Sequence, residues 1–385
     1  MKTVVFWPLL LLLAGCSAFS GKDNADPPSE LIELEPELRI EEVWDAGFED
    51  ADEAMLKLAP VISEGILYVA EPSGEVFALD PKTGDRRWSV DTESPLSGGP
   101  GVAEGSIALG TLEAELILLS SEDGAERWRR RVSSEVLSSP VINDRKVVCR
   151  TTDGGVAVYA IENGEKRWVY DRSVPVLTLR GDSSPMVNDY QVLTGFAGGK
   201  LVGLSLESGL VNWEATISTP KGRTELERVV DIDADPVLVE GTLYVSSYQG
   251  DVAAVSESSG VVLWRRNISS HAGLDANWRQ VFITDDEDHV WSLDATNGAT
   301  LWQQKKLHAR KLSAPAMVDD KIVVGDFDGY LHWLSQEDGR QLARIRVSGD
   351  AIRLKPLVMD DIVYVLDEGG NLNALRAQPI ETEIP

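Results

Sequence analysis

The sequence is poor in residues that form disulfides, bind metals or attract phosphate groups. Its 385 residues include two cysteines and four histidines, and 63 Asp and Glu outnumber 36 Lys and Arg, for a formal net charge of −27. Such an acidic surface repels phosphate backbones, so we predict that the protein binds no nucleic acid. Hydrophobic residues still make up 43% of the chain, enough for a large core, which excludes global disorder.

Near its start the chain has an apolar run that is too short to span a bilayer. This run, over residues 4–13, follows Lys2 and ends in the sequence Leu-Ala-Gly-Cys at residues 13–16. Its length and position are typical of a signal peptide, and its last four residues look like the lipobox of lipoprotein precursors. We therefore predict that residues 1–15 are removed and that Cys16 is lipid-modified. The alternative is an ordinary secretory signal followed by an incidental cysteine.

The neighbours of the two cysteines predict location and redox state. Lipid-modified cysteines of similar lipoproteins carry several acyl chains, palmitate among them, and more than one chain anchors a protein stably. Ser17 rather than Asp follows Cys16, which by resemblance to enterobacterial lipoproteins implies the outer membrane. Cys149 lies in an apolar run, so we predict a small buried hydrophobe and no intramolecular disulfide.

The body of the chain is built from a repeated unit. Six times a proline stands fourteen residues before a glycine, at Pro60/Gly74, Pro140/Gly154, Pro185/Gly199, Pro236/Gly250, Pro315/Gly329 and Pro356/Gly370. Pro100/Ala114 and Leu274/Asp288 hold these places in two further units, which gives eight. Later in six of the units, a glycine precedes a tryptophan by four residues, at Gly84/Trp88, Gly124/Trp128, Gly164/Trp168, Gly209/Trp213, Gly260/Trp264 and Gly298/Trp302.

Each unit contains four short strands separated by turns. In the third unit, strand-like segments over residues 139–142, 146–151, 156–161 and 166–170 alternate with turns rich in Gly, Asn and Asp. Repeats of about 40–50 residues with four strands each are typical of β-propeller blades. We predict an all-β fold, an eight-bladed propeller of four-stranded antiparallel blades over residues 39–378, with the tryptophans packed between neighbouring blades.

The eighth unit ends before its tryptophan-bearing strand, and a spare strand precedes the first unit. That spare strand runs from Arg39 to Trp44. Pairing it with the eighth unit would close the ring and remove an exposed sheet edge. Residues 16–38, rich in acidic residues and proline, are then predicted to form a flexible tether between lipid and propeller, and residues 379–385 a C-terminal tail.

Motifs of catalysis and ligand binding are scarce. The histidines show no His-x-x-x-His spacing, so we predict no metal site, and no nucleotide-binding or serine-hydrolase signature occurs. The acidic run over residues 285–288 favours a solvated turn over a cation site. The Arg-Gly-Asp sequence at residues 180–182 favours a surface loop over an adhesion motif. We therefore predict no catalytic, cofactor-binding or metal-binding residue.

Two successive linkers between units are enlarged. The distance from Trp168 to Pro185 is 17 residues and that from Trp213 to Pro236 is 23, against 12 in each of the first two linkers. Irregular places in repeat proteins tend to carry function. We expect the two linkers side by side on one face, where an apolar, Arg-bearing loop beside an acidic one favours protein docking over mere tolerance of insertions.

The repeat pattern resembles that of a known enzyme class. Ala-x-x-x-Gly-x-x-x-Trp is similar to the tryptophan-docking repeat of the pyrroloquinoline quinone (PQQ) dehydrogenases, which also have eight blades. That resemblance would imply adjacent cysteines, a calcium site and long insertions around the cofactor, none of which is visible in the sequence. We predict that the protein is no enzyme and has no cofactor. A PQQ-dependent dehydrogenase and a periplasmic propeller that binds a small ligand are the alternatives.

A second resemblance covers essentially the whole chain. The lipobox, acidic tether, eight units and two linkers together resemble the family of outer-membrane protein assembly factor B (BamB), most specifically at residues 177–181 and 228–233. This implies a non-catalytic scaffold lipoprotein of the β-barrel assembly (BAM) machinery at the periplasmic face of the outer membrane. Its partners would be the POTRA domains of BamA and, through them, the other BAM lipoproteins; contact with unfolded clients stays open. The family's interaction positions fall here on Leu177, Leu179, Arg180, Asp231 and Asp233.

The lipid anchor is tested by Cys16→Ala. Because the thiol accepts the first lipid, the variant should accumulate as an unprocessed precursor without acyl label, measured by metabolic labelling with a fatty acid. Normal processing and labelling of this variant would contradict the prediction.

Overall fold

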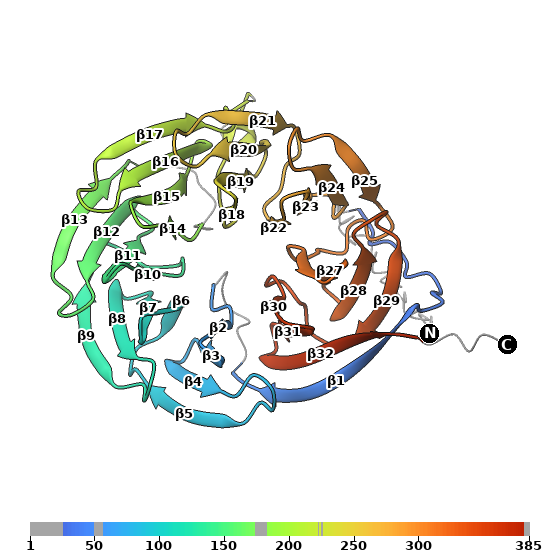
Figure 1. Ribbon diagram of the computed structural model, residues 1–385, viewed down its shortest axis with the longest axis horizontal. Helices are drawn as coiled ribbons and strands as arrows, with labels where there is room; N and C mark the ends of the chain where they lie inside the picture. Colours follow the sequence, from blue (N-terminus) through green and yellow to red (C-terminus); the bar gives the residue numbers. More distant parts are fainter. Residues whose placement is uncertain (1–25, 50–56, 174–182, 222, 225, 381–385) are drawn as a thin grey trace, which may run out of the picture.

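The computed structural model describes residues 26–49, 57–173, 183–221, 223–224 and 226–380. Within these ranges, eight four-stranded antiparallel sheets stand as blades around a central axis (Figure 1). The prediction of an all-β, eight-bladed propeller is confirmed. A short 3-10 helix, η1 (Leu226–Arg228), lies between the fourth and fifth blades. The described residues contain no helix that is long and apolar enough to cross a membrane.

The first seven blades each use four strands that follow one another in sequence. Blades one and two comprise β2 (Val61–Ser63), β3 (Ile66–Ala70), β4 (Glu75–Leu79), β5 (Arg86–Asp91), β6 (Leu96–Ala103), β7 (Ser106–Thr111), β8 (Glu115–Ser120) and β9 (Glu126–Arg131). Blades three and four comprise β10 (Val141–Asn143), β11 (Lys146–Arg150), β12 (Gly155–Ala160), β13 (Lys166–Asp171), β14 (Met186–Val187), β15 (Gln191–Phe196), β16 (Lys200–Ser205) and β17 (Val211–Thr216). Blades five and six comprise β18 (Val237–Val239), β19 (Thr242–Ser246), β20 (Val252–Ser256), β21 (Val262–Arg266), β22 (Gly273–Ala276), β23 (Gln280–Thr284), β24 (Val290–Asp294) and β25 (Thr300–Gln304). Blade seven comprises β26 (Ala316–Val318), β27 (Lys321–Gly325), β28 (Tyr330–Ser335) and β29 (Gln341–Arg346).

The eighth blade joins the two ends of the propeller. Its strands are β30 (Leu357–Met359), β31 (Ile362–Leu366), β32 (Asn371–Pro379) and, as the outermost, β1 (Leu38–Gly47). β1 pairs antiparallel with β32 from Leu38 opposite Pro379 to Gly47 opposite Asn371, and the two strands lie side by side in Figure 1. The spare strand expected over residues 39–44 thus closes the ring.

The tryptophans pack between neighbouring blades, as predicted. The indole N–H of Trp44 donates to the carbonyl oxygen of Pro81 in blade one at 2.9 Å. Equivalent bonds of 2.8–3.0 Å run from Trp128 to Ile161, Trp168 to Leu206, Trp213 to Glu257, Trp264 to Ala295 and Trp302 to Gln336.

A glycine of the next blade receives each ring. Gly84 has a φ of +74°, and a Cβ atom there would lie 2.8 Å from Trp44 Cε3. Glycine is required both for this backbone conformation and for the close approach of the indole. The glycine and the tryptophan of one unit thus act at two different interfaces. The glycine contacts the indole of the preceding blade, and the tryptophan packs on the glycine of the following blade.

The missing tryptophan of blade seven has a structural reason. Ala343 holds that place in β29, and it faces a blade whose outer strand comes from the other end of the chain. Blade eight therefore has no turn between its third and fourth strands, and no glycine there to receive an indole. Leu38 and Ile40 of β1 pack against the cluster that contains Leu342 and Ala343 instead.

The hydrophobic core lies between blades rather than within them. Each of the eight buried clusters in the described residues contains side chains from two neighbouring blades. Cys149 belongs to the cluster between blades two and three and is fully buried, and this burial raises the pKa of its thiol to about 12. It is the small buried hydrophobe that the sequence predicts.

Trp44→Ala tests how strongly ring closure depends on this packing. The indole is 8% exposed and forms the bond to Pro81, so we expect the free energy of unfolding to fall by about 3–5 kcal/mol in urea denaturation. Trp278, 65% exposed, is the control; Trp278→Ala should change it by about 0.5 kcal/mol or less. Similar losses in both variants would contradict the role of Trp44.

Candidate protein-docking site

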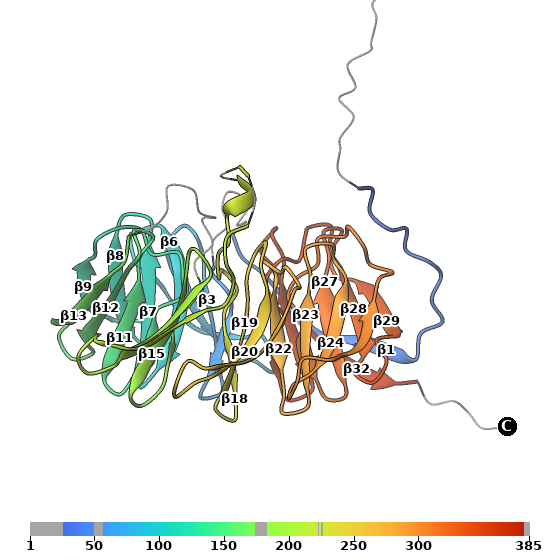
Figure 2. The same ribbon diagram turned by 90° about the horizontal axis from the view of Figure 1, so that it is seen from above.

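One face of the ring carries both the linkers between blades and the turns between second and third strands. This follows because the strands of each blade alternate in direction. We call it the linker face. The linker over residues 217–236 joins β17 to β18 and carries η1, the yellow-green coil that stands above the ring in Figure 2.

The base of this linker is wedged between blades four and five. Asp231 forms isolated bridges with Ala197 and Tyr248, which belong to the turns of these two blades. Its carboxylate also accepts a hydrogen bond from the N–H of Gly198 at 3.3 Å. Ile232 is buried against Gly195, where an added Cβ would lie 2.4 Å from the isoleucine Cγ2. The linker therefore leaves the ring from a fixed position.

This geometry corrects the expected placement of the two aspartates. Alternation along an extended chain predicts that Asp231 and Asp233 share one exposed side. Asp231 is instead only 3% exposed, because the turns of both neighbouring blades cover it. Asp233 is half-buried, and its carbonyl oxygen accepts a hydrogen bond from Lys57 Nζ at 2.9 Å. Asp231 is thus placed to hold the linker rather than to touch a partner directly.

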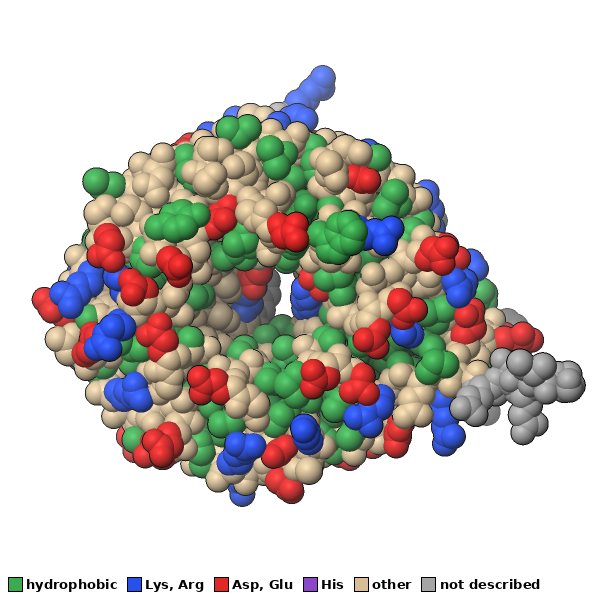
Figure 3. Space-filling view, viewed as in Figure 1, with side chains coloured by type: hydrophobic (Ala, Val, Ile, Leu, Met, Phe, Trp, Pro, Cys, Tyr) green, Lys and Arg blue, Asp and Glu red, His purple; other side chains and the backbone are tan. Residues whose placement is uncertain are grey.

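Asp233 lies where the linker meets the mouth of the central channel. It lines a cavity of about 800 Å³ together with Lys57, Asp235, His271 and Lys355. Figure 3, which views the ring from the opposite face, shows that the ring is open at its centre. The mouth thus offers both signs of charge to a partner.

The tip of the linker presents an apolar side chain that the sequence analysis missed. Leu226 of η1 is 70% exposed. The Glu227 carboxylate accepts hydrogen bonds from the N–H groups of Arg223 and Thr224, which lower its pKa, and Glu227 N–H donates to Thr224 Oγ1. This is a capping box, and its Thr-x-x-Glu spacing could have revealed the helical turn beforehand.

Several predicted positions lie outside the described residues. They are Cys16, Leu177, Leu179, Arg180 and the Arg-Gly-Asp sequence at residues 180–182. Their assignments stay predictions, as does the expected proximity of the two enlarged linkers.

Residues 26–37 form an N-terminal arm that lies along blades six and seven. Ser29 N–H donates to the carbonyl oxygen of His308 at 3.0 Å, Arg344 Nη2 to that of Ile32 at 3.2 Å, and Glu37 N–H to that of Leu342 at 2.8 Å. In Figure 2 this blue segment rises from β1 towards the linker face. The sequence predicts a flexible tether here; these described residues are docked instead.

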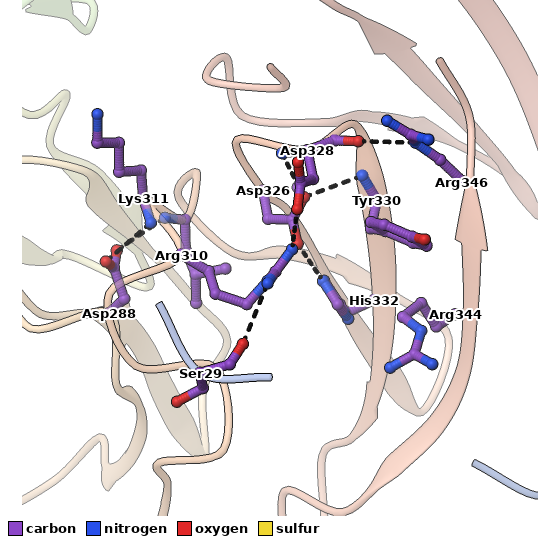
Figure 4. Close-up of polar contacts among 12 residues, drawn as sticks. Ser29, Asp288, Arg310, Lys311, Asp326, Asp328, Tyr330, His332, Arg344 and Arg346 are labelled. Atoms are coloured by element: carbon purple, nitrogen blue, oxygen red, sulfur yellow. Dashed lines mark hydrogen bonds and ion pairs between the residues drawn. The ribbon is translucent and has the colours of Figure 1, made fainter. Parts of the chain in front are cut away.

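A buried guanidinium connects the arm to blade seven. Arg310 donates from Nε to Asp326 Oδ2 at 2.7 Å, from Nη2 to Asp328 Oδ2 at 2.9 Å and from Nη1 to the carbonyl oxygen of Ser29 at 3.1 Å (Figure 4). Asp326 Oδ2 also lies 2.9 Å from Nε2 of His332, and both of these side chains are fully buried.

The charges of this network follow from its burial. Burial lowers the pKa of His332 and outweighs the opposite effect of Asp326. The neutral ring then donates from Nε2 and keeps an unprotonated Nδ1, which has no hydrogen-bond partner among the described residues. Burial opposes ionisation of Asp326, but hydrogen bonds from His332 and Arg310 prevail and lower its pKa.

The acidic run over residues 285–288 is a turn, as expected, but two of its carboxylates, those of Asp285 and Asp288, are buried rather than solvated. Asp285 accepts hydrogen bonds from the N–H of residue 289 at 2.8 Å and from the Trp291 indole at 2.7 Å. Asp288 accepts one from the N–H of Lys311 at 2.8 Å. These carboxylates are buried because they satisfy N–H groups of the linker face.

Two groups of known proteins share this architecture. A family model described as "Glucose/ethanol/alcohol dehydrogenase, beta-propeller domain" matches residues 37–105. The quinohemoprotein alcohol dehydrogenase of Comamonas testosteroni superposes with a TM-score of 0.67 at 14% identity, over 89% of this chain and 78% of that one, which shows the fold alone. The model described as "Outer membrane protein assembly factor BamB" matches residues 72–304 and 292–379.

Relatives in the second group are much more similar. BamB of Pseudomonas aeruginosa is 45% identical over 374 residues, 97% of this chain and 98% of that one. BamB of Salmonella typhimurium is 31% identical over 375 residues, 94% and 96% of the two chains. The crystal structure of BamB from Moraxella catarrhalis superposes with a TM-score of 0.81 at 25% identity, over 88% of this chain and all of that one.

The ring and its docking tryptophans define an eight-bladed propeller of PQQ-like repeats. Within this class the chain belongs to the BamB family, since that family model and full-length relatives cover nearly all of it. The resemblance seen in the sequence is confirmed. The prediction that the protein is not an enzyme is confirmed as well, because these relatives are assembly factors.

The buried network predicts how stability depends on pH. Unfolded histidine titrates near pH 6.5 and aspartate near 3.9, and the folded pKa values of His332 and Asp326 are both lowered. The unfolded state therefore binds more protons below about pH 6.5, so stability should fall as the pH drops from 7 to 5. His332→Asn should make this fall shallower, measured as the melting temperature against pH.

A second histidine provides a control of opposite sign. The hydrogen bond to Asp286 raises the pKa of His271, so this residue adds stability below the unfolded value of about 6.5. His271→Gln should therefore steepen the fall. An unchanged slope in His332→Asn, or a shallower one in His271→Gln, would contradict these assignments.

Proposed function

We propose that this protein is a non-catalytic scaffold of the outer-membrane BAM complex and binds the POTRA domains of BamA through its linker face. The observation that carries the proposal is the linker over residues 217–236, which projects from the ring in a chain of the BamB family. Through BamA the scaffold would reach the other BAM lipoproteins and assist the insertion of β-barrel proteins.

The chemistry of the linker supports a protein partner. A single large apolar side chain at the tip, Leu226, can fill a hollow on the partner, and such central anchors dominate many interfaces. Asp233 at the channel mouth can attract basic groups and orient the encounter. Leu177, Leu179 and Arg180 of the preceding linker are proposed to add two apolar anchors and a guanidinium suited to a carboxylate.

The arm supports an orientation relative to the membrane. Asp26, its first described residue, follows Cys16 by ten residues, a length that spans at most about 35 Å. Because the arm rises towards the linker face, a lipid on Cys16 would hold that face near the outer membrane, on its periplasmic side. A BamA subunit in the same membrane would then meet the linker face first.

Capture by purified POTRA domains of BamA tests this proposal. Leu179→Ala, Arg180→Ala and Leu226→Ala should each raise the dissociation constant at least about tenfold, since each removes a proposed anchor. Asp233→Lys should weaken binding more at low salt than at high salt. At low salt the repulsion between the new lysine and the basic groups of the partner is screened less. Circular dichroism checks that the variants stay folded.

Matched controls come from the same face. Leu112 lies in a turn of blade two on the linker face and is 47% exposed, and Ser133 and Glu135 lie in the short linker that follows β9. Leu112→Ala, Ser133→Ala and Glu135→Ala should leave binding within about twofold. Equal losses in these controls, or full binding by Leu226→Ala and Arg180→Ala together, would place the interface elsewhere.

A further inference from the structure

Three side chains that could bind a metal ion meet on the linker face of blade six. Glu287 and His289 belong to the turn between β23 and β24, and His308 to the linker between β25 and β26. Potential ligand atoms of all three lie within 4.8 Å of one another. The two imidazole rings are stacked, with centroids 5.4 Å apart and planes inclined by 26°.

The hydrogen bonds of His308 leave one ring nitrogen available to a metal. Its Nδ1 lies 2.8 Å from the carbonyl oxygen of Glu287. A carbonyl only accepts, so Nδ1 carries a hydrogen and Nε2 is the ring nitrogen available to a metal. Metal-binding histidines commonly donate their other ring N–H to a carbonyl or carboxylate in this way.

His289 is held just as firmly. It is 9% exposed, and its Nδ1 lies 3.2 Å from Asp285 Oδ2. Asp285 is itself fixed by the Trp291 indole at 2.7 Å. Histidines that bind zinc commonly donate their other ring N–H to a carboxylate, and that carboxylate is in turn held by another hydrogen-bond donor.

The N-terminal arm brings a fourth candidate ligand. Asp26 Oδ2 lies 3.7 Å from His308 Nε2. Two hydrogen bonds of Ser29, one to the carbonyl oxygen of His308 and one from Arg310, hold this part of the arm in place. Asp26 and Glu287 are exposed, so their carboxylates can move to meet an ion.

We propose that Glu287, His289 and His308 bind a divalent ion of the zinc type, with Asp26 of the arm as the fourth ligand. Two imidazoles and two carboxylates suit Zn²⁺, whose bonds of about 2.0–2.2 Å put tetrahedral ligand atoms about 3.4 Å apart. The 3.7 Å between Asp26 Oδ2 and His308 Nε2 is already near this value, and the candidate ligand atoms of Glu287, His289 and His308 lie within 4.8 Å of one another. The ion would fasten the lipid-bearing arm to blade six.

A metal-free ion pair is the competing explanation. A protonated His289 could interact with Asp285 at 3.2 Å and with Glu287 at 3.6 Å without any ion. That explanation does not account for the stacking of the His308 ring on His289. It predicts no saturable metal binding, so the two explanations are separable by experiment.

Titration of Zn²⁺ into the tag-free, detergent-solubilised full-length protein, stripped beforehand with EDTA, tests the site by calorimetry. We expect one equivalent to bind, and Co²⁺ at the same place to give the intense visible absorption of tetrahedral coordination. His308→Gln and Glu287→Gln should each weaken Zn²⁺ binding at least about tenfold and abolish the Co²⁺ colour.

His271→Gln is the matched control, because His271 also pairs with an aspartate, Asp286 at 2.6 Å, but faces no second histidine. It should leave the affinity for Zn²⁺ unchanged. The absence of saturable binding, or equal losses in His271→Gln and His308→Gln, would overturn the proposal. Full affinity in Asp26→Asn would overturn the part that includes the arm.

Discussion

The packing of one blade's indole onto the next blade is the contact on which the rest of the structure depends. The blades bury their apolar residues against each other, as the eight shared clusters show, so each needs two neighbours. Seven interfaces contain an indole packed closely on a glycine, and six of these indoles also donate a hydrogen bond across the interface. Aliphatic side chains fill the remaining interface, between blades seven and eight. The ring closes when blades eight and one meet, and Trp44 supplies the indole of that interface from the opposite end of the chain.

Because these contacts occupy the blade interfaces, the connections between blades are free to vary. The linker over residues 217–236 uses that freedom: Ile232 and Asp231 fix its base, while Leu226 projects from its tip. The arm over residues 26–37 rises towards the same face. The projecting linker and the channel mouth therefore share the side of the ring towards which the arm rises, and the opposite side has none of the proposed contacts.

Much of the fold is predictable from the sequence because the same residues recur at the same spacing in successive units. The strand order, the closing strand and the packing of the tryptophans all follow from spacing alone. Features that occur only once in the chain have no such pattern, so the repeat cannot predict them. Alternation misplaces Asp231 because isolated bridges, not a strand, set its direction, and docking of the arm depends on Arg310, buried in another blade. His289 and His308 meet only through the fold, so ligand spacing along the chain cannot reveal them.

We propose that the linker face, and not the opposite face, meets the partner. Hydrogen exchange of the full-length protein, measured by mass spectrometry with and without the POTRA domains of BamA, tests it most directly. We expect slower exchange over residues 217–236 and in the turn at residues 197–199, and no change in the turn at residues 207–209 on the opposite face. Protection confined to that opposite turn, or none anywhere despite binding, would contradict it.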